Sequence, residues 1–350
     1  MTRIAVIPGD GIGVEVTREA VAALRCAASR EGFEVETEEL PWGADHFLTT
    51  GQTLPAGALD RLRAFDAILL GALGDPRVPD NRHAAEILLG IRFGLDLYVN
   101  FRPVRLLDDR LCPLRGRGVG DVDFVVFREN TEGLYVGMGG FFKKGTADEI
   151  AVQEDVNTRK GVERIVRQAF EHARTRSRRR VLMSDKSNAL TYGHDLWQRV
   201  FREVARDYPD IETSHMYVDA LAMQMIRDPS QFEVIVTCNM FGDILTDVAA
   251  ALQGGLGIAA SANLHPGKTG LFEPVHGSAP KHAGRDVANP MGAILSAALL
   301  LDSVGRRGAA ARLESAVTAC VRAGETTRDL GGPLGTRAAG EAVRRRIATG

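Results

Sequence analysis

FEVIVTCNMFGDILTD, residues Phe232–Asp247, predicts a buried strand, a turn and a helix in that order. The β-branched run 234–236 is typical of a strand inside an α/β sheet. The turn at 239–242 leads into a helix with Asp243 in its first turn and Asp247 four residues later. Because positions i and i+4 share a helix face, both carboxylates are expected side by side at the carboxyl end of a strand, where open α/β sheets bind ligands.

Two adjacent carboxylates repel each other unless a cation lies between them. A hard divalent cation such as Mg²⁺ or Mn²⁺, which prefers oxygen ligands, is the simplest candidate. The alternative is that Asp243 only complements the helix dipole while Asp247 is solvated. For an isolated pair of aspartates this alternative would be favoured, so the case for a metal depends on the rest of the chain.

The composition indicates a cytoplasmic protein of two domains. With 350 residues, 45% of them hydrophobic, the chain can bury a large core. The net charge of −2 and the lack of interleaved aromatics give no support for nucleic-acid or membrane binding. The four cysteines have no CxxC spacing and are typical of reduced thiols. The longest apolar stretch, Ala293–Leu301, is too short to span a bilayer.

Short apolar runs alternate with helical patterns along the chain. Arg3–Pro8, Ala67–Leu70, Asp123–Arg128 and Val181–Met183 are predicted strands, and Gly139–Glu154 is predicted to be a protruding hairpin. Such alternation predicts an α/β fold with parallel or mixed sheets flanked by helices.

Three arginines lie at or near the ends of predicted elements. Arg92 is in a helical segment, Arg102 directly precedes a proline, and Arg128 ends a strand. Arginine suits bidentate recognition of carboxylates. Any one of the three would be more typical of a surface ion pair, but three beside a metal site would suit a small di- or tricarboxylate.

Two further charged residues follow strands. Lys186 comes after the strand 181–183 and could act as a general base if metal or burial lowers its pKa, whereas an exposed turn lysine is the alternative. Asp219 comes after the strand 215–218 and is a third candidate metal ligand. It could also be the N-cap of a helix at 220–227, and both roles can hold together.

Two glycine-containing loops are candidates for binding a nucleotide. Gly9–Gly13 lacks the dinucleotide fingerprint spacing, so a tight strand–helix turn is as consistent with it as a phosphate cradle. The loop 271–284 is rich in Gly, Ser and Pro and can offer backbone N–H groups to a nucleotide.

The chain resembles the β-decarboxylating hydroxyacid dehydrogenases, a family that includes isopropylmalate, isocitrate, homoisocitrate and tartrate/D-malate dehydrogenases. The resemblance extends from Ile4 to about Asp302 and rests on six motifs in the family's order: IPGDGIG, LYVNFRP, RENTEGLY, DKSN, NMFGDILTD and FEPVHGSAP…ANP. It implies the family's own two-domain α/β fold, not a Rossmann fold. Residues 1–97 and 252–350 would form a cofactor-side domain, and residues 98–251 would carry dimerisation, substrate and metal binding.

The resemblance also implies oxidative decarboxylation of a 2-hydroxyacid with a nicotinamide as hydride acceptor. Lys186, paired with Asp219, would relay the proton from the substrate hydroxyl, and Tyr135 would protonate the enolate carbon after CO₂ leaves. The family's lysine and its paired aspartate act across the subunit boundary, so a homodimer with shared active sites is implied. The substrate carboxylates and the Mg²⁺ or Mn²⁺ ion would be held by an arginine set and an aspartate set: Arg92, Arg102, Arg128; Asp219, Asp243, Asp247.

The segment before Arg92 is where the family selects its substrate. Isocitrate enzymes carry serine at the position of Glu86 and asparagine at that of Leu88, and Glu86 would repel the extra carboxylate. Leu88 and Leu89 resemble the apolar pocket of isopropylmalate dehydrogenases, whose glutamate lies slightly earlier, where this chain has alanines. A 3-isopropylmalate-like substrate is therefore expected. Tartrate, D-malate, homoisocitrate or another 3-substituted malate are the alternatives.

The cofactor segment departs from that of NAD-dependent members, which carry an aspartate after HGSAP. This chain has Lys281 and His282, and Lys281, together with Arg328, would attract a 2′-phosphate. NADP⁺ is therefore expected over NAD⁺, and a surface lysine that tolerates NAD⁺ is the alternative. The adenosine half would contact the preceding loop and an asparagine beyond it: His276, Gly277, Ser278, Ala279, Asn289.

A non-catalytic relative that keeps the fold and binds a nucleotide or a partner is the competing class. Such a copy should have lost Lys186, Tyr135 or one of the three aspartates, and all of them are present. A metal-dependent activity screen would separate the two classes.

Overall fold

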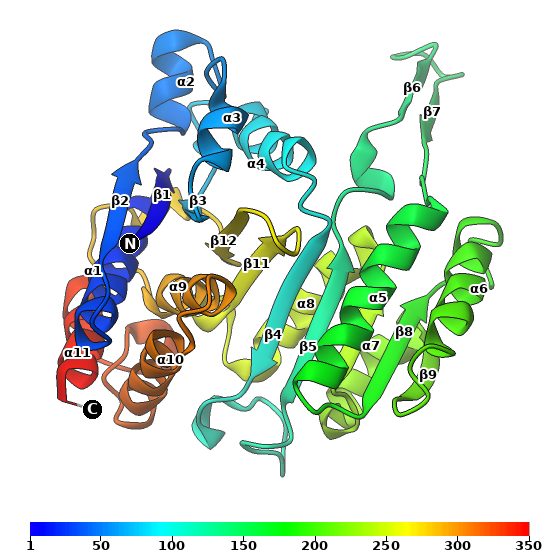
Figure 1. Cartoon of the computed structure of the whole chain (residues 1–350). Helices are drawn as coiled ribbons and strands as arrows, with labels where there is room; N and C mark the ends of the chain where they lie inside the picture. Colours follow the sequence, from blue (N-terminus) through cyan, green and yellow to red (C-terminus); the bar gives the residue numbers. More distant parts are fainter. Residues whose placement is uncertain (350) are drawn as a thin grey trace. The chain divides into compact units, whose positions relative to one another are not determined.

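The computed structural model describes residues 1–349, which form two compact units (Figure 1). Unit 1 contains residues 1–97, 102–122 and the chain from Ala250 onward, and unit 2 contains residues 98–101 and 123–249. Strand β4 (Val99–Arg105) begins in unit 2 and ends in unit 1.

The division differs from the sequence-based one in the segment 102–122, which belongs to unit 1. Its hydrogen bonds explain the difference. The Arg105 main-chain N–H donates to Gln253 at 2.9 Å, and the Arg110 guanidinium donates to the Val321 carbonyl at 2.7 Å. The sequence pattern of this loop gives no sign of these partners.

The strands of unit 1 run in the order β2-β1-β3-β12-β11. Neighbouring strands are parallel except the hairpin pair β11 and β12. β1 therefore lies between β2 and β3, and its carboxyl end leads into the glycine loop at Gly9. The bounds are β1 Thr2–Gly9, β2 Val35–Glu39, β3 Ala67–Ala72, β11 Ala260–Leu264 and β12 Gly270–Pro274.

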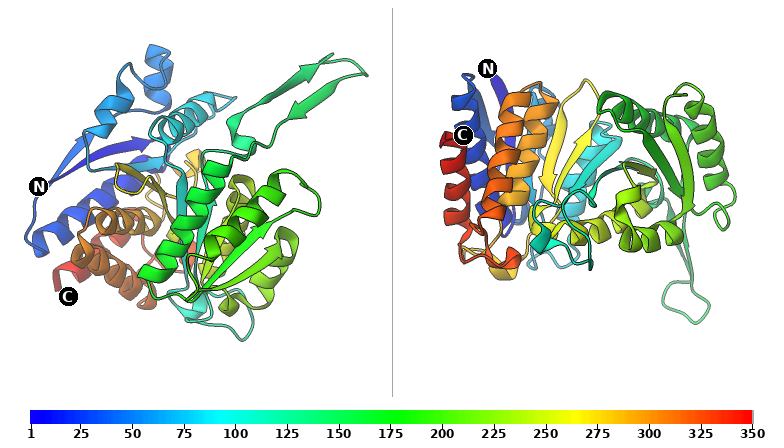
Figure 2. Two further views of the ribbon diagram at one scale, coloured as in Figure 1. Left: turned by 45° about the vertical axis from the view of Figure 1, so that its right-hand side comes forward. Right: turned by 90° about the horizontal axis from the view of Figure 1, so that it is seen from below.

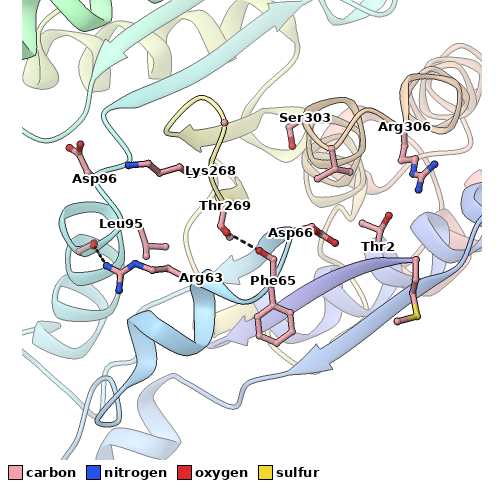
Figure 3. A pocket seen from close by; sticks show the side chains of 14 residues that line it. Thr2, Arg63, Phe65, Asp66, Leu95, Asp96, Lys268, Thr269, Ser303 and Arg306 are labelled. Atoms are coloured by element: carbon pink, nitrogen blue, oxygen red, sulfur yellow. Dashed lines mark hydrogen bonds between the residues drawn. The ribbon is translucent and has the colours of Figure 1, made fainter.

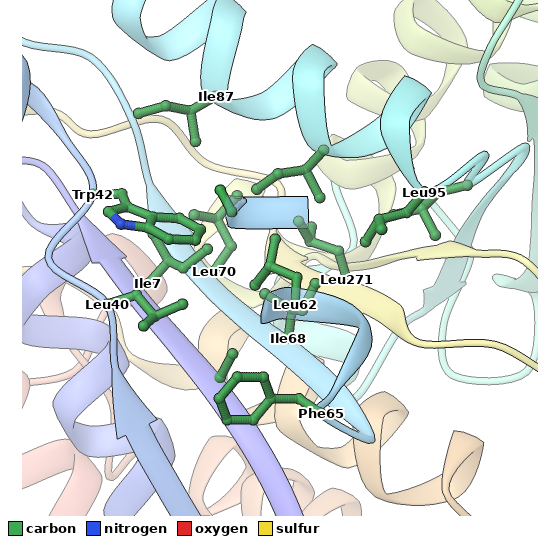
Figure 4. Close-up of a cluster of buried hydrophobic side chains, with 14 residues drawn as sticks. Ile7, Leu40, Trp42, Leu62, Phe65, Ile68, Leu70, Ile87, Leu95 and Leu271 are labelled. Carbon is green, nitrogen blue, oxygen red and sulfur yellow. The ribbon is translucent and has the colours of Figure 1, made fainter. Parts of the chain in front are cut away.

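Helices of unit 1 cover both faces of these strands. On one face α1, α9, α10 and α11 pack against one another and against β1, β3, β11 and β12 (Figure 1). On the other face a cluster of buried apolar side chains joins α3 and α4 to β1, β3 and β12 (Figure 4). The bounds are α1 Gly13–Arg30, α2 Ala44–Thr50, α3 Ala58–Arg63, α4 Arg82–Gly94, α9 Met291–Ser303, α10 Arg307–Arg322 and α11 Thr336–Thr349.

That buried cluster fixes α4, the helix that carries Arg92. Ile87 and Ile91 are both fully buried in it, and they are four residues apart on one face of α4. Ile68 and Leu70 of β3 both pack into this cluster, because alternate strand residues point to the same side of a sheet. Each such side chain stabilises the fold by about 1.5–3 kcal/mol, so the orientation of α4 is strongly determined.

Unit 2 has four parallel strands in the order β5-β10-β8-β9, together with a separate hairpin of β6 and β7. Helices α5 and α6 pack together on one face, and α7 and α8 lie behind (Figures 1 and 2). The hairpin projects from the rest of unit 2 at the predicted position (Figure 2). The bounds are β5 Asp123–Glu129, β6 Gly139–Phe142, β7 Ile150–Gln153, β8 Arg180–Asp185, β9 Glu212–Tyr217, β10 Val234–Thr237, α5 Arg159–Thr175, α6 Gly193–Ala205, α7 Val218–Arg227 and α8 Asn239–Gln253.

Helix α8 begins earlier than the sequence predicts. Residues 239–242 form its first turn, so Asp243 lies in the second turn and not in the first. Gly242 suggested a turn, but it lies inside the helix. A glycine is needed at this position because Arg128 packs against it. A Cβ at Gly242 would come 2.6 Å from the Arg128 Cβ. The glycine therefore serves a close contact and does not end or begin the helix.

A cavity of about 900 Å³ lies in unit 1 beside the start of β1 (Figure 3). Thr2 of β1, Phe65 before β3, and Thr269 before β12 line it. The glycine loop follows the other end of β1, so this cavity contains none of the predicted site residues. Among the described residues, no helix is long and apolar enough to cross a membrane.

Candidate active site

A cluster of hydrogen-bonded side chains in unit 2 surrounds Asp243. Strand β5 delivers Arg128, which is only 1% exposed. Its Nη1 donates to Asp243 Oδ1 at 2.5 Å, and its Nε donates to Asn239 Oδ1 at 2.9 Å. The Tyr135 hydroxyl donates to Asp243 Oδ2 at 2.9 Å from the short 3₁₀ turn Leu134–Val136. The structure thus brings together a predicted substrate arginine, the predicted proton donor and a predicted metal ligand.

Lys186 and Asp219 form a second pair in unit 2. Lys186 follows the end of β8, and its Nζ donates to Asp219 Oδ1 at 2.8 Å. This hydrogen bond lowers the pKa of the Asp219 carboxyl below its usual range. The N-cap of α7 is Tyr217, so Asp219 lies in the first turn and is not the N-cap. The pairing predicted for Lys186 and Asp219 is present within one chain.

The three aspartates do not form one metal site in a single chain. Asp243 and Asp247 share a face of α8, and their oxygens suit a hard divalent cation. Within residues 1–349, no group of three or more His, Cys, Asp or Glu side chains is arranged to hold a metal ion. A site built from Asp243 and Asp247 would need further oxygen ligands from substrate, water or another subunit.

Arg92 in unit 1 is held in place by a buried ion pair. The residue is 5% exposed, and its Nη2 donates to Glu273 Oε1 at 3.1 Å. Asn263 donates to the same carboxylate oxygen at 2.8 Å. Glu273 belongs to the FEPVHGSAP motif, but nothing in the sequence pattern linked it to Arg92. Arg102, the second predicted substrate arginine of unit 1, is 8% exposed on β4.

The side chains predicted to select the substrate lie on different sides of α4. At 100° per residue, Glu86 is about 120° away from Arg92, and its carboxylate accepts from the Thr53 hydroxyl at 3.0 Å. Leu88 packs against the buried cluster of unit 1. Leu89 and Ala85 lie within about 60° and 20° of Arg92 around the helix axis. The face beside Arg92 is therefore apolar.

The glycine loop of unit 1 is packed against the loop that contains Ser278. The Ile12 N–H donates to the Ser278 carbonyl at 2.8 Å. Gly11 has φ +56°, and a Cβ there would lie 2.1 Å from the Ser278 carbonyl oxygen. Ala279 has φ +37°, a conformation that is costly for a residue with a Cβ and that is common at ligand-binding sites. Both predicted nucleotide loops are therefore parts of one closely packed structure.

Asp10 is a buried residue that the sequence motif contained but whose role it did not indicate. Its carboxylate accepts from the main-chain N–H groups of Ala44 and Gly74 at 2.7 and 2.8 Å. His83 Nε2 lies 2.9 Å from the same carboxylate. Asp10 thus ties the glycine loop to α2, to the loop after β3 and to the start of α4.

The remaining predicted cofactor residues are also in unit 1. His276 contacts the Gly277 carbonyl through Nδ1, and burial lowers the pKa of its imidazole. Asn289 donates to Asp329 at 2.9 Å and accepts from the Met291 N–H at 3.0 Å. Lys281 and His282 are both exposed in a short 3₁₀ turn. The side chains of both residues are thus accessible to a ligand.

The sequence of this chain is similar to those of known proteins. The family model described as isocitrate/isopropylmalate dehydrogenase matches residues 3–343. The chain is 46% identical to a 3-isopropylmalate dehydrogenase of Thermobifida fusca, with 99% of this chain and 98% of the relative covered. It is 49% identical to a 3-isopropylmalate dehydrogenase of Clavibacter sepedonicus with the same coverage of the two chains.

A solved structure agrees with the fold. The crystal structure of isocitrate dehydrogenase from Methylococcus capsulatus matches with a TM-score of 0.90 and 38% identity, covering 99% of each chain. This match confirms the predicted α/β fold, and the match of the family model confirms the resemblance carried by the six motifs. The chain belongs to the isocitrate/isopropylmalate dehydrogenase family, a family of decarboxylating dehydrogenases that use a divalent metal and an NAD-type cofactor.

Proposed function

We propose that this chain catalyses the metal-dependent oxidative decarboxylation of 3-isopropylmalate, or of a closely similar 3-substituted malate, to a 2-oxo acid in the cytoplasm. The observation that carries the proposal is the cluster around Asp243. Arg128 and Tyr135 both hydrogen-bond to that carboxylate. This arrangement suits a residue that binds a substrate carboxylate and a residue that donates a proton, both next to a metal ligand. Curated relatives at 46–49% identity are named 3-isopropylmalate dehydrogenase, which supports this substrate.

The residues of unit 2 supply the acid and the base of the reaction. Lys186 accepts the proton of the substrate C2 hydroxyl, and its contact with Asp219 keeps the amine oriented. A bound nicotinamide would accept the hydride from C2, after which CO₂ would leave C3. The Tyr135 hydroxyl donates its proton to C3 and so completes the 2-oxo acid. Arg128 binds a carboxylate of the substrate throughout, together with Arg92 and Arg102.

Asp243 and Asp247 are the residues proposed to hold Mg²⁺ or Mn²⁺. The fit rests on the oxygen ligands of two carboxylates that share a face of α8. When bound, the ion polarises the C2 oxygen of the substrate and stabilises negative charge there. Since residues 1–349 contain no group of three His, Cys, Asp or Glu side chains placed to hold a metal ion, Asp219 is proposed to come from the other subunit of a homodimer.

Exposed apolar side chains of unit 2 support the homodimer. Phe141, Phe142, Ile150 and Val152 of the projecting hairpin are each at least half exposed. A group of this kind on a hairpin marks an interaction surface, because isolated two-stranded hairpins are only marginally stable in water. A concentration series in sedimentation velocity should give a dimer, and a monomer at micromolar concentration would contradict this part of the proposal.

NADP⁺ is the proposed hydride acceptor. Lys281 and Arg328 are both exposed in unit 1, and the Asn289–Asp329 hydrogen bond joins the turn of Arg328 to the predicted cofactor residue Asn289. Lys281→Asp should raise the kcat/KM for NAD⁺ relative to NADP⁺, because an aspartate repels the 2′-phosphate. Lys268→Asp, at an exposed lysine beside the cavity at the start of β1, is the control and should leave the preference unchanged.

The test of the activity is turnover at the nicotinamide absorbance with Mg²⁺ or Mn²⁺ and five substrates. They are 3-isopropylmalate, isocitrate, homoisocitrate, D-malate and tartrate. We expect the highest kcat/KM with 3-isopropylmalate and loss of turnover on chelation of the metal. A higher kcat/KM for isocitrate would contradict the assignment.

A second candidate substrate is a malate with a different apolar 3-substituent. Ala85 lies about 20° from Arg92 around α4, and Glu86 is turned toward Thr53. The face beside Arg92 therefore carries a small side chain, which would leave room for a larger group. Low turnover of all five substrates, followed by higher turnover of a bulkier 3-alkylmalate, would favour this candidate.

A further inference from the structure

A buried histidine of α6 contacts the main chain of the predicted proton relay. His194 is fully buried, and its Nδ1 accepts a hydrogen bond from the Lys186 main-chain N–H at 2.7 Å. Lys186 is eight residues earlier, directly after β8. The Lys186 carbonyl in turn accepts from the N–H groups of Ala189 and Leu190. Both polar groups of the Lys186 main chain are therefore bonded in the turn between β8 and α6.

The hydrogen bond from the Lys186 N–H determines the protonation state and the tautomer of the His194 imidazole. A main-chain N–H can only donate, so Nδ1 must present its lone pair and cannot carry a proton. His194 is then neutral, with its single proton on Nε2. Nε2 lies 4.0 Å from Asp155 Oδ2, and the ring packs edge-on against Phe241 with centroids 5.5 Å apart. These neighbours leave the ring one orientation.

The residue before Lys186 is fixed just as firmly. Asp185 is fully buried, and its carboxylate accepts from Gln198 Nε2 at 2.8 Å and from the Ser187 N–H at 3.0 Å. His215 Nε2 lies 2.9 Å from it. Such a set of bonds holds the end of β8 at both peptide groups around Lys186. The Lys186 side chain can then change position only by rotation about its own side-chain bonds.

We propose that His194 is a positioning residue for the reaction, whose neutral ring accepts the Lys186 N–H and sets the direction in which the Lys186 side chain leaves β8. From that direction the amine reaches Asp219 at 2.8 Å. The inference rests on the role of Lys186 in the proposed function. A displacement of about 1 Å at a proton-transfer group can lower a rate by about 10²-fold, so a small main-chain shift would be visible in kcat.

Protonation of His194 would remove the contact, because both ring nitrogens would then donate. Burial lowers the pKa of His194, while the carboxylates of Asp185 and Asp155 act in the opposite direction. Lys186 contacts the ring through its main-chain N–H, and Phe241 of α8 carries no charge. The relay should therefore be intact at neutral pH and should lose its alignment as His194 takes up a proton in acid.

Three variants of the whole enzyme test the inference. His194→Leu removes the acceptor, whereas His194→Asn keeps an oxygen near the place of Nδ1 and cannot be protonated. Val200→Ala, at another buried position of α6, controls for a general loss of packing. We would measure kcat and KM for 3-isopropylmalate from pH 5 to 8, the melting temperature, and the hydrogen exchange of the Lys186 amide by NMR.

We expect His194→Leu to lower kcat by about 10- to 100-fold with KM changed less than about threefold, and Val200→Ala to leave both near wild type. His194→Asn should retain most of kcat and lose part of the acid limb of the pH profile. A kcat within twofold of wild type for His194→Leu would overturn the inference, and so would an equal loss in His194→Asn.

The amide exchange separates this inference from the proposed function. Inactivity of the wild-type enzyme toward every malate would contradict the function alone. In that case slow exchange of the Lys186 amide in wild type and His194→Asn would still support the contact, and fast exchange in both would overturn it. If His194→Leu does not fold, the pH profile and the exchange of His194→Asn decide.

Discussion

The predicted cofactor loops of unit 1 and the proposed catalytic cluster of unit 2 are built in opposite ways. In unit 1 main-chain groups take part in the contacts, as in the bond from the Ile12 N–H to the Ser278 carbonyl and those from the Ala44 and Gly74 N–H groups to the Asp10 carboxylate. In unit 2 functional side chains bond to one another, as in Arg128 with Asp243.

Because of this difference, we expect substitutions in the two regions to affect different properties of the protein. Main-chain packing at Gly11 leaves no room for an added atom, so substitutions there should act on stability. The Lys186–Asp219 ion pair of unit 2 is partly exposed, with the two side chains 28% and 68% accessible. Partly exposed pairs contribute little to folding, so substitutions there should act on activity.

The largest effect is expected at Lys186. Lys186→Met should lower kcat by about 10²- to 10⁴-fold, or about 2.7–5.4 kcal/mol, because the proposed general base is lost. Its unfolding free energy should stay within about 0.5 kcal/mol of wild type. Lys160→Met, at an exposed lysine of α5, is the control for both measurements. A fall in kcat of less than tenfold would contradict the expectation that substitutions in the unit 2 pair act on activity.

The next effect is expected in the glycine loop. Gly11→Ala should lower the unfolding free energy by about 3 kcal/mol, because the new Cβ would overlap the Ser278 carbonyl. Gly32→Ala has a similar positive φ, +70°, but its Cβ would meet nothing within 4 Å, so it should cost only about 1 kcal/mol. Urea unfolding of both variants measures the difference, and equal losses would show that the close approach carries no penalty.

A smaller effect is expected at Asp10. Asp10→Asn should lower the unfolding free energy by about 2 kcal/mol, because the new amide directs a donor at a partner that also donates. Asp45→Asn, whose carboxylate forms only an exposed ion pair with Arg77, should change it by less than about 0.5 kcal/mol. Thermal unfolding of the two variants gives the comparison. Losses of similar size would mean that the main-chain bonds of Asp10 are no stronger than a surface contact.

The smallest effect is expected in the pH dependence of stability. Burial lowers the pKa of His194 in the folded state, while an unfolded histidine titrates near 6.5. Between those two values the unfolded chain binds more protons, so stability falls as the pH drops below about 6.5. The slope is at most about 1.4 kcal/mol per pH unit for one group. His194→Asn should flatten this part of the profile, and an unchanged slope would place the titration elsewhere.

The strands and the hairpin were predictable from the sequence because each has a local signal, whereas the pairing of Lys186 with Asp219 was implied by the family resemblance. Lys186 and Asp219 each follow a predicted strand, and the structure pairs them at 2.8 Å. Gly242 misled the prediction, since a glycine that admits Arg128 looks the same in a sequence as one that makes a turn. The partners Glu273, Thr53 and His194 could not be found from the sequence because their contacts depend on packing between separate elements. The metal and cofactor residues stay predictions.

The order of segments along the chain has a consequence for synthesis. Strand β3 of unit 1 pairs with β12, so the sheet of unit 1 cannot close until residues 270–274 have been made. Residues 98–249, which include all of unit 2, are translated in between and take roughly 8–30 s at about 5–20 residues per second. During that time the apolar side chains of Ile68 and Leu70 lack their partner Leu271. Unit 2 can therefore fold first, while the first 97 residues keep an incomplete core whose apolar surface is exposed to aggregation until β12 has been made.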